Sequence, residues 1–182
     1  MKVKGCIERP TAGTGQGECA PADGVEQVSR ETGVGTERTP AWVPAFVFGM
    51  GVGGFVDGIV LHQLLQWHHI LSHTQAGNTK TLAGLELNTL ADGVFHSVMW
   101  VLVVAAAALA IRARQQRRLS PSWRFHIGLV LAGWGVFNVV EGLINHQLLG
   151  IHHVRDDLGG PLAWDLGFLA VSLVLVACGW LL

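Results

Sequence analysis

The sequence predicts an all-α fold, a polytopic membrane four-helix bundle built from two duplicated helical hairpins. Half of the 182 residues are hydrophobic and only 14% are charged, whereas soluble domains carry about a quarter charged residues. Four long apolar stretches follow one another along the chain, and one long motif occurs twice. The mean hydropathy of +0.41 agrees with a chain that lies mostly within a bilayer.

The four apolar stretches are each long enough to cross a hydrocarbon core of about 30 Å as a helix, at 1.5 Å per residue. We expect spans at about 45–66, 85–111, 125–150 and 162–182. Residues 1–40 are rich in Gly, Thr and Glu and contain no apolar run like that of a signal peptide. They are expected to form a disordered cytoplasmic tail, which leaves 41–182 as the transmembrane domain.

The loop between the second and third spans indicates the orientation. Its basic residues are Arg112, Arg114, Arg117, Arg118 and Arg124, and it contains no acid. By the positive-inside rule this loop faces the cytoplasm, so a multi-pass protein of the cell membrane with both termini in the cytoplasm is expected. The lipid bilayer is the expected partner, and a net charge of -1 gives no reason to expect nucleic acid. A homo-oligomer and a redox partner are both left open.

The repeated motif places an acid and a histidine in the first span and again in the third. Asp57-Gly-Ile-Val-Leu-His62-Gln63-Leu-Leu-Gln-Trp-His68-His69 recurs as Glu141-Gly-Leu-Ile-Asn-His146-Gln147-Leu-Leu-Gly-Ile-His152-His153, 84 residues further along. The second helix of each half corresponds less well. Asp92 has a counterpart in Asp165, but the position equivalent to His96 holds Leu169. We interpret the pattern as an internal duplication into two parallel hairpins.

Each predicted span contains at least one carboxylate, and no span contains lysine or arginine. A charged acid inside a membrane is costly unless it lines a cavity, pairs or binds an ion. The candidate metal ligands in the spans are Asp57, His62, Asp92, His96, Glu141, His146 and Asp165. The flanking pairs His68, His69, His152 and His153 form either a second metal-capture site or a wet interfacial belt. Gln63, Asn88, Asn138, Asn145 and Gln147 are expected to orient the ligands by hydrogen bonds.

The ligand types narrow the metal only to a group. Carboxylate and imidazole without thiolate suit a transition metal ion, and copper, iron, zinc and manganese are not distinguished. Asp92 and His96 lie four residues apart and therefore share one face of a helix. In the first and third spans the acid and the histidine lie five residues apart, which in an α-helix separates their directions by roughly 140°. We therefore expect that pair not to bind one ion together.

Several functions agree with these residues. The leading interpretation is a metalloprotein whose His/carboxylate site lies near the extracytoplasmic face, a metal-dependent oxidoreductase. One alternative is a non-catalytic haem or metal-binding carrier, with His62 and His146 as axial ligands of a haem. Another is an ion or proton translocator that uses the intramembrane carboxylates. The same residues would also serve as a hydrogen-bonded polar network that only holds the helices together.

The motifs around Asp57, Asn88 to His96, and Asn138 to Arg155 resemble a bacterial family of predicted membrane proteins catalogued as domain of unknown function 2243. The resemblance runs from about Phe46 to the C-terminus and implies four spans, with no activity attached. The Asp-x-x-x-His pair of Asp92 and His96 is also similar to the copper-binding membrane helix of particulate methane and ammonia monooxygenases. That resemblance implies copper, although the third ligand position of the pattern holds Leu109 here.

Overall fold

The computed structural model describes residues 6–7, 20–21 and 39–182, and the chain divides into two units, Met1–Arg38 and Thr39–Leu182. In the first unit, strands β1 (Cys6–Ile7) and β2 (Ala20–Pro21) pair in antiparallel fashion. The rest of the predicted tail lies outside the described residues, so its disorder stays a prediction.

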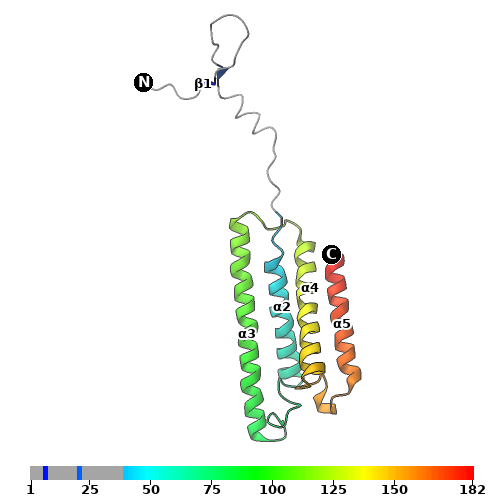
Figure 1. Ribbon diagram of the computed structural model, residues 1–182. Helices are drawn as coiled ribbons and strands as arrows, with labels where there is room; N and C mark the ends of the chain where they lie inside the picture. The colour runs from blue at the N-terminus through cyan, green and yellow to red at the C-terminus, as the bar shows by residue number, and fades with distance from the viewer. Residues whose placement is uncertain (1–5, 8–19, 22–38) are drawn as a thin grey trace, which may run out of the picture. The chain divides into compact units, whose positions relative to one another are not determined.

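The second unit is a bundle of long helices with short connections. Its elements are α2 (Val43–Val56), the π-helix η1 (Asp57–Leu64), α3 (Leu82–Gln115), α4 (Trp123–Glu141), the π-helix η2 (Gly142–Leu148), the 3-10 helix η3 (Asp156–Leu158) and α5 (Leu162–Leu181). In Figure 1 the helices lie side by side with α2 and α4 between α3 and α5; consecutive helices run in opposite directions, so the neighbours α2 and α4 are parallel.

The all-α class and the membrane assignment are confirmed. Among the described residues, four helices are long and apolar enough to span a bilayer: Val43–Leu64, Leu82–Gln115, Trp123–Leu148 and Leu162–Leu181. Side-chain caps begin two of them, because Thr81 Oγ1 accepts a bond from the Gly84 amide and Ser122 Oγ accepts one from the Phe125 amide. At 34 residues α3 is about 50 Å long, so it extends beyond the hydrocarbon core.

The distribution of polar and apolar side chains is the reverse of that in a soluble bundle. Large hydrophobic side chains are exposed along the helices, for example Leu90, Val171 and Trp180. The buried polar and charged residues are Asp57, His62, His68, Asn88, Asp92, Asn138, Glu141, His146, His152, Asp165 and Ser172. Exposed apolar surface of this extent is stable against lipid, whereas in water it would cost about 25 cal/mol for each Å². The bundle therefore has a lipid-facing exterior and a polar interior.

Two glycines allow the central helices to touch. A Cβ on Gly49 would lie 2.2 Å from the carbonyl oxygen of Val130, and a Cβ on Gly133 would lie 2.1 Å from that of Phe46. The backbones of α2 and α4 therefore meet directly, as membrane helices with small residues at their crossing do. Each residue of the first contact lies 84 positions from its equivalent in the second.

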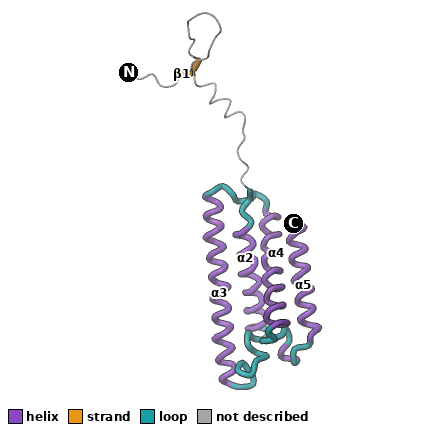
Figure 2. Tube along the Cα trace, viewed as in Figure 1, coloured by secondary structure: helices purple, strands orange, loops and turns teal. Residues whose placement is uncertain are grey.

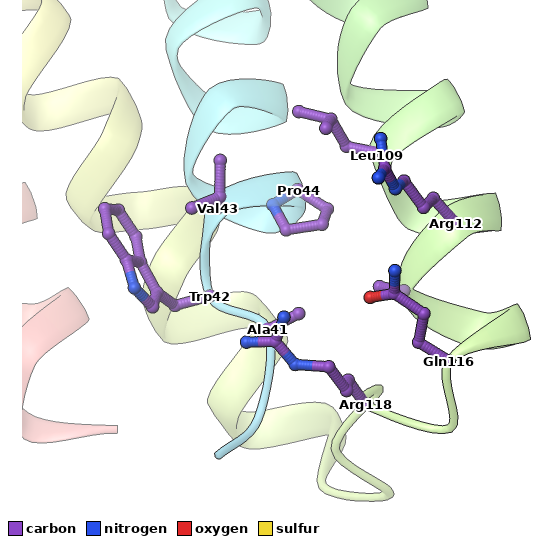
Figure 3. Close-up of a pocket in the computed structure, with 9 residues that line it drawn as sticks. Ala41, Trp42, Val43, Pro44, Leu109, Arg112, Gln116 and Arg118 are labelled. Carbon is purple, nitrogen blue, oxygen red and sulfur yellow. The ribbon is translucent and has the colours of Figure 1, made fainter. Parts of the chain in front are cut away.

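The arginine-rich loop lies at one end of the bundle, beside the start of α2. The amide of Ala41 donates to the carbonyl of Arg118 over 2.8 Å, and Arg118 Nε donates to the carbonyl of Thr39 over 3.3 Å. A cavity of about 340 Å³ opens here between α2 and α3, with Trp42 and Arg112 in its wall (Figure 3). The loops 65–81 and 149–161 lie at the opposite end (Figure 2).

Candidate metal centre

Both copies of the repeated motif form a π-helix where the acid and the histidine lie five residues apart. Asp57 Oδ2 lies 3.3 Å from His62 Nε2, and Glu141 Oε1 lies 3.2 Å from His146 Nε2. The expectation that these pairs diverge is therefore wrong. It assumed an α-helix, whereas the i to i+5 bonds of a π-helix place residues five apart on one face.

After each π-helix the chain turns back and carries a second histidine under the first. Gln66 and Gly150 have positive φ angles, 51° and 56°, which reverse the chain at equivalent positions. His68 Nδ1 then bonds the carbonyl oxygen of Val154, and His152 Nδ1 bonds that of Ile70, both over 3.0 Å. Each of these histidines is thus fixed by the loop of the other half.

Four imidazoles and two carboxylates meet at the centre of this end. The ring centroids of His62 and His68 are 4.6 Å apart, those of His146 and His152 are 4.7 Å apart, and those of His68 and His152 are 4.8 Å apart. Asp57 Oδ1 lies 3.8 Å from His68 Nε2, and Glu141 Oε1 lies 2.8 Å from His152 Nε2. All six residues are at most 6% exposed, so the cluster is out of contact with bulk water.

The bonds at Nδ1 determine the state of the nitrogens that face the centre. A carbonyl oxygen only accepts, so Nδ1 of both His68 and His152 carries a proton. In a neutral imidazole Nε2 then has a lone pair and no proton, yet Nε2 of His152 lies against Oε1 of Glu141. Two acceptors therefore face each other. A proton or a metal ion between them is needed to make this contact favourable.

Burial favours the neutral ring at one of these histidines. Removal from water lowers the pKa of His68 to about 4, so its Nε2 is a free electron-pair donor at neutral pH. Among the described residues, the buried centre atoms without a hydrogen-bond partner are Asp57 Oδ2, His62 Nε2, His68 Nε2, Glu141 Oε2, and both ring nitrogens of His146. Buried polar atoms are rarely left unpaired, so this concentration requires an explanation.

The spacing of the ligand atoms suits metal coordination. Metal to nitrogen or oxygen bonds of about 2.0–2.2 Å place two ligands of a tetrahedral ion about 3.3 Å apart. The carboxylate to Nε2 distances within the halves are 3.3 and 3.8 Å for Asp57 and 3.2 and 2.8 Å for Glu141. Two groups of three have all their ligand atoms within 4.8 Å of one another: His62, His68 and His152, and Glu141, His146 and His152.

Asp92 and Asp165 lie behind the histidines. Asp92 accepts bonds from His62 Nδ1, Gln63 Nε2, His69 Nδ1 and the Ile70 amide, over 2.7 to 3.1 Å. Asp165 accepts bonds from Gln147 Nε2, His153 Nδ1 and the Val154 amide, and lies 3.4 Å from His146 Nδ1. Both carboxylates therefore orient imidazoles and hold the loops, and their oxygens are occupied by these contacts.

The other predicted site residues lie around the centre. Asn145 Nδ2 donates to Glu141 Oε1 over 3.4 Å, and Asn138 is buried. Asn88 Oδ1 accepts a bond from the Leu71 amide, and Asn88 Nδ2 donates to the carbonyls of Gly77 and Gly84. His96 was expected to bind a metal on the same helix face as Asp92, but it does not lie at the centre. Its ring stacks on Phe55, and its Nε2 would lie 2.3 Å from a Cβ on Gly58.

A cavity of about 430 Å³ lies over the centre and is called the vestibule below. Its wall includes His68, His69, His73, Lys80 and Asp156. His73 Nδ1 lies 3.0 Å from Asp156 Oδ1, and neither residue was among the predicted ligands. One feature of the sequence could have indicated His73 as a site residue: His73 and Asp157 are polar residues at equivalent positions of the two halves.

The backbone hydrogen bonds of the two loops also correspond. The His73 amide donates to the carbonyl of Ile151 over 3.0 Å, and the Asp157 amide donates to that of Trp67 over 3.1 Å. Donor and acceptor of the first bond each lie 84 residues from their equivalents in the second. Each loop therefore donates an equivalent backbone hydrogen bond to the other loop.

Comparison with known protein families gives a match over residues 44–182 to a family described as a predicted membrane protein, DUF2243. No curated protein and no solved structure matches the chain. The match covers more than half of the sequence and includes all the residues of the centre. The resemblance noted from the motifs is thereby confirmed, and the chain belongs to the DUF2243 family of predicted membrane proteins.

Proposed function

We propose that this membrane protein is a metalloprotein with a centre of two neighbouring transition metal ions. Asp57, His62 and His68 hold one ion, and Glu141, His146 and His152 hold the other. The observation that carries the proposal is that Nε2 of His62, His68 and His152 each lies against a carboxylate oxygen while Nδ1 of the same ring is bonded elsewhere. A metal ion between these atoms would satisfy the contacts, and its ligands must be deprotonated.

The donor set favours a redox-active metal. Two imidazoles and one carboxylate on each ion form the ligand set of non-haem Fe(II) oxygenases, which leaves positions on the metal open. Carboxylate-bridged pairs of iron or manganese ions also occur within soluble four-helix bundles. We therefore infer a metal-dependent oxidoreductase. From the arginine loop at the other end of the bundle, we infer that the centre lies near the extracytoplasmic face.

We also infer that the two halves arose by duplication. The π-helices, the positive φ angles, the imidazole to carbonyl bonds and the glycine contacts all recur at equivalent positions. Asp92 and Asp165 fulfil the same role in both halves. Contacts of this kind are not a consequence of apolar composition, so a shared ancestral hairpin is the simplest explanation of their repetition.

The geometry favours this function over the alternatives. A haem between His62 and His146 would have to separate imidazoles that are already in ring contact through His68 and His152. A translocator needs a polar route along the bundle, whereas the centre's carboxylates all lie at one end. A polar network that only joins helices would pair its atoms, and here the buried atoms facing the centre are left unpaired.

Elemental analysis of the purified full-length protein, with its visible spectrum, tests the proposal. We expect two equivalents of one transition metal per chain and no Soret band. One equivalent would overturn the two-ion centre, a Soret band would support the haem carrier, and no bound metal after reconstitution with Fe²⁺, Cu²⁺, Mn²⁺ or Zn²⁺ would refute the proposal.

Substitutions in the two halves test whether the centre is shared. His62→Ala and His146→Ala should each remove most of the metal of the whole chain, and the double variant should lose little more, because the ions share neighbours. His96→Leu is the matched control, since Leu169 occupies the equivalent place against Gly142. Metal content that falls by half in each single variant, and additively in the double variant, would contradict a shared centre.

A further inference from the structure

The vestibule is a cavity in the described structure whose wall reaches the buried centre. His68, a member of the centre, forms part of its wall, together with the partly exposed residues His69 and His73. The second half has no matching set, because His73 corresponds to Asp157 and Ser72 corresponds to Asp156. The vestibule is therefore a feature that the repeated fold does not require.

The histidines around the vestibule are graded by exposure. The side chain of His73 is 46% exposed, that of His153 is 21%, that of His69 is 17% and that of His68 is 0%. The rings of His73 and His153 touch at the outer end, with centroids 4.6 Å apart. A series of imidazoles thus leads from the solvent to the centre.

All four imidazoles are bonded through the same nitrogen. Nδ1 lies against Asp156 in His73, against Asp165 in His153, against Asp92 in His69, and against the carbonyl of Val154 in His68. These oxygens accept the Nδ1 proton, which leaves Nε2 available to a metal in each ring. A carboxylate or a carbonyl behind a metal-binding histidine is also the usual way in which such a ligand is oriented.

The number of ligands available to an ion increases along the series. At the mouth the imidazoles of His73 and His153 lie close together, and their partial exposure leaves water to complete the coordination. At the centre each proposed ion meets two imidazoles and a carboxylate, out of contact with bulk water. The affinity for a metal ion is therefore expected to be lower at the mouth than at the centre, so an ion bound at the mouth can dissociate and move on to the centre.

Building on the proposed function, we propose that the vestibule is the access route of the metal, and that His73 and His153 form a two-imidazole capture site for a hydrated divalent transition metal ion. The ion passes from this pair along His69 to His68. The bond from His73 Nδ1 to Asp156 Oδ1 orients the outer ring. The role of the pair is kinetic, since the final ligands lie elsewhere.

The rate of metal uptake tests the route separately from the centre. Metal-free full-length protein in nanodiscs is mixed with Co²⁺, and the visible absorption of the bound ion is followed over time. Removal of local capture should slow uptake by about tenfold or more in His73→Gln and in His153→Ala, with the final Co²⁺ content unchanged. Gln at position 73 retains an amide that can donate to Asp156, so the loop is preserved while a good ligand is lost.

Ser72→Ala is the matched control, because it removes a bond to Asp156 without removing an imidazole. It should take up Co²⁺ at the wild-type rate. Wild-type rates in His73→Gln and His153→Ala would overturn the route and leave the centre intact. A lower final content at an unchanged rate would also overturn it, because the pair would then be a storage site. No uptake by the wild-type protein would refute the centre itself.

Discussion

At the scale of single residues, the two aspartates behind the centre control the direction of its ligands. Asp92 accepts four hydrogen bonds, two of them from imidazoles, and Asp165 holds the equivalent position. A carboxylate can accept all of these bonds because it carries no donor. An amide of the same shape would present a donor to some of these N–H groups, and the imidazoles would lose their fixed orientation.

We therefore expect Asp92→Asn and Asp165→Asn each to weaken metal binding by about 10- to 100-fold while the protein still folds. The affinity is measured by competition with a chelator of known strength. Asn145→Ala serves as a milder comparison, since its contact with Glu141 is long, 3.4 Å. An unchanged affinity in both aspartate variants would show that these carboxylates only join the helices.

At the scale of the elements, hydropathy predicted the helices well and their ends less well. The first span was expected at about 45–66 and is Val43–Leu64, because its length and apolar composition are visible in the sequence. The π-helices were not predicted, since a change from i+4 to i+5 bonding leaves no mark on hydropathy. The fold of loop 65–81 depends on a positive φ at Gln66, a residue that seldom adopts it.

The same limit applies to the centre. The candidate residues could be selected from the sequence because charged groups are rare in spans, but their arrangement could not. His68 and His152 were as compatible with a wet belt as with a metal site, and their burial to 2% and 0% depends on contacts between the loops. Such contacts join residues 86 and 82 positions apart, which local patterns do not describe.

The crossing of α2 and α4 gives a prediction at this scale. Gly49→Ala or Gly133→Ala would place a methyl group 2.2 or 2.1 Å from a carbonyl oxygen, so the helices must separate at a cost of about 1–3 kcal/mol. Thermal unfolding in detergent measures the loss. Gly93→Ala is the control, because nothing lies within 4 Å of its Cβ, and there a gain of about 0.5–1 kcal/mol is expected. Equal stability of the three variants would contradict the close crossing.

At the scale of the whole molecule, all the basic residues between the second and third spans lie at one end and the centre lies at the other. The arginine loop is tied to the start of α2 through Arg118, so the N-terminal side of the bundle shares its orientation. The positive charge favours the cytoplasmic side. The loop that carries the vestibule is then expected to face outward.

Accessibility of a tag placed within residues 75 to 80 measures this orientation in intact cells. We expect the tag to be labelled by a membrane-impermeant reagent without permeabilisation, because the positive-inside rule places this loop on the outer face. A tag in the arginine loop near residue 120 is the internal control and should be labelled only after permeabilisation. The reverse pattern would move the centre to the cytoplasmic side.

His68 bonds the carbonyl of Val154 in the second half, and His152 bonds the carbonyl of Ile70 in the first half. Each half therefore depends on the other to orient one of its two imidazoles. If both halves descend from one ancestral hairpin, that hairpin functioned only as a symmetric homodimer, with the same surface used by both copies. Fusion of two such copies into one gene would then release each from the demands of symmetry. Under that hypothesis His96, which stands where the other half has Leu169, is a position at which the two copies have diverged.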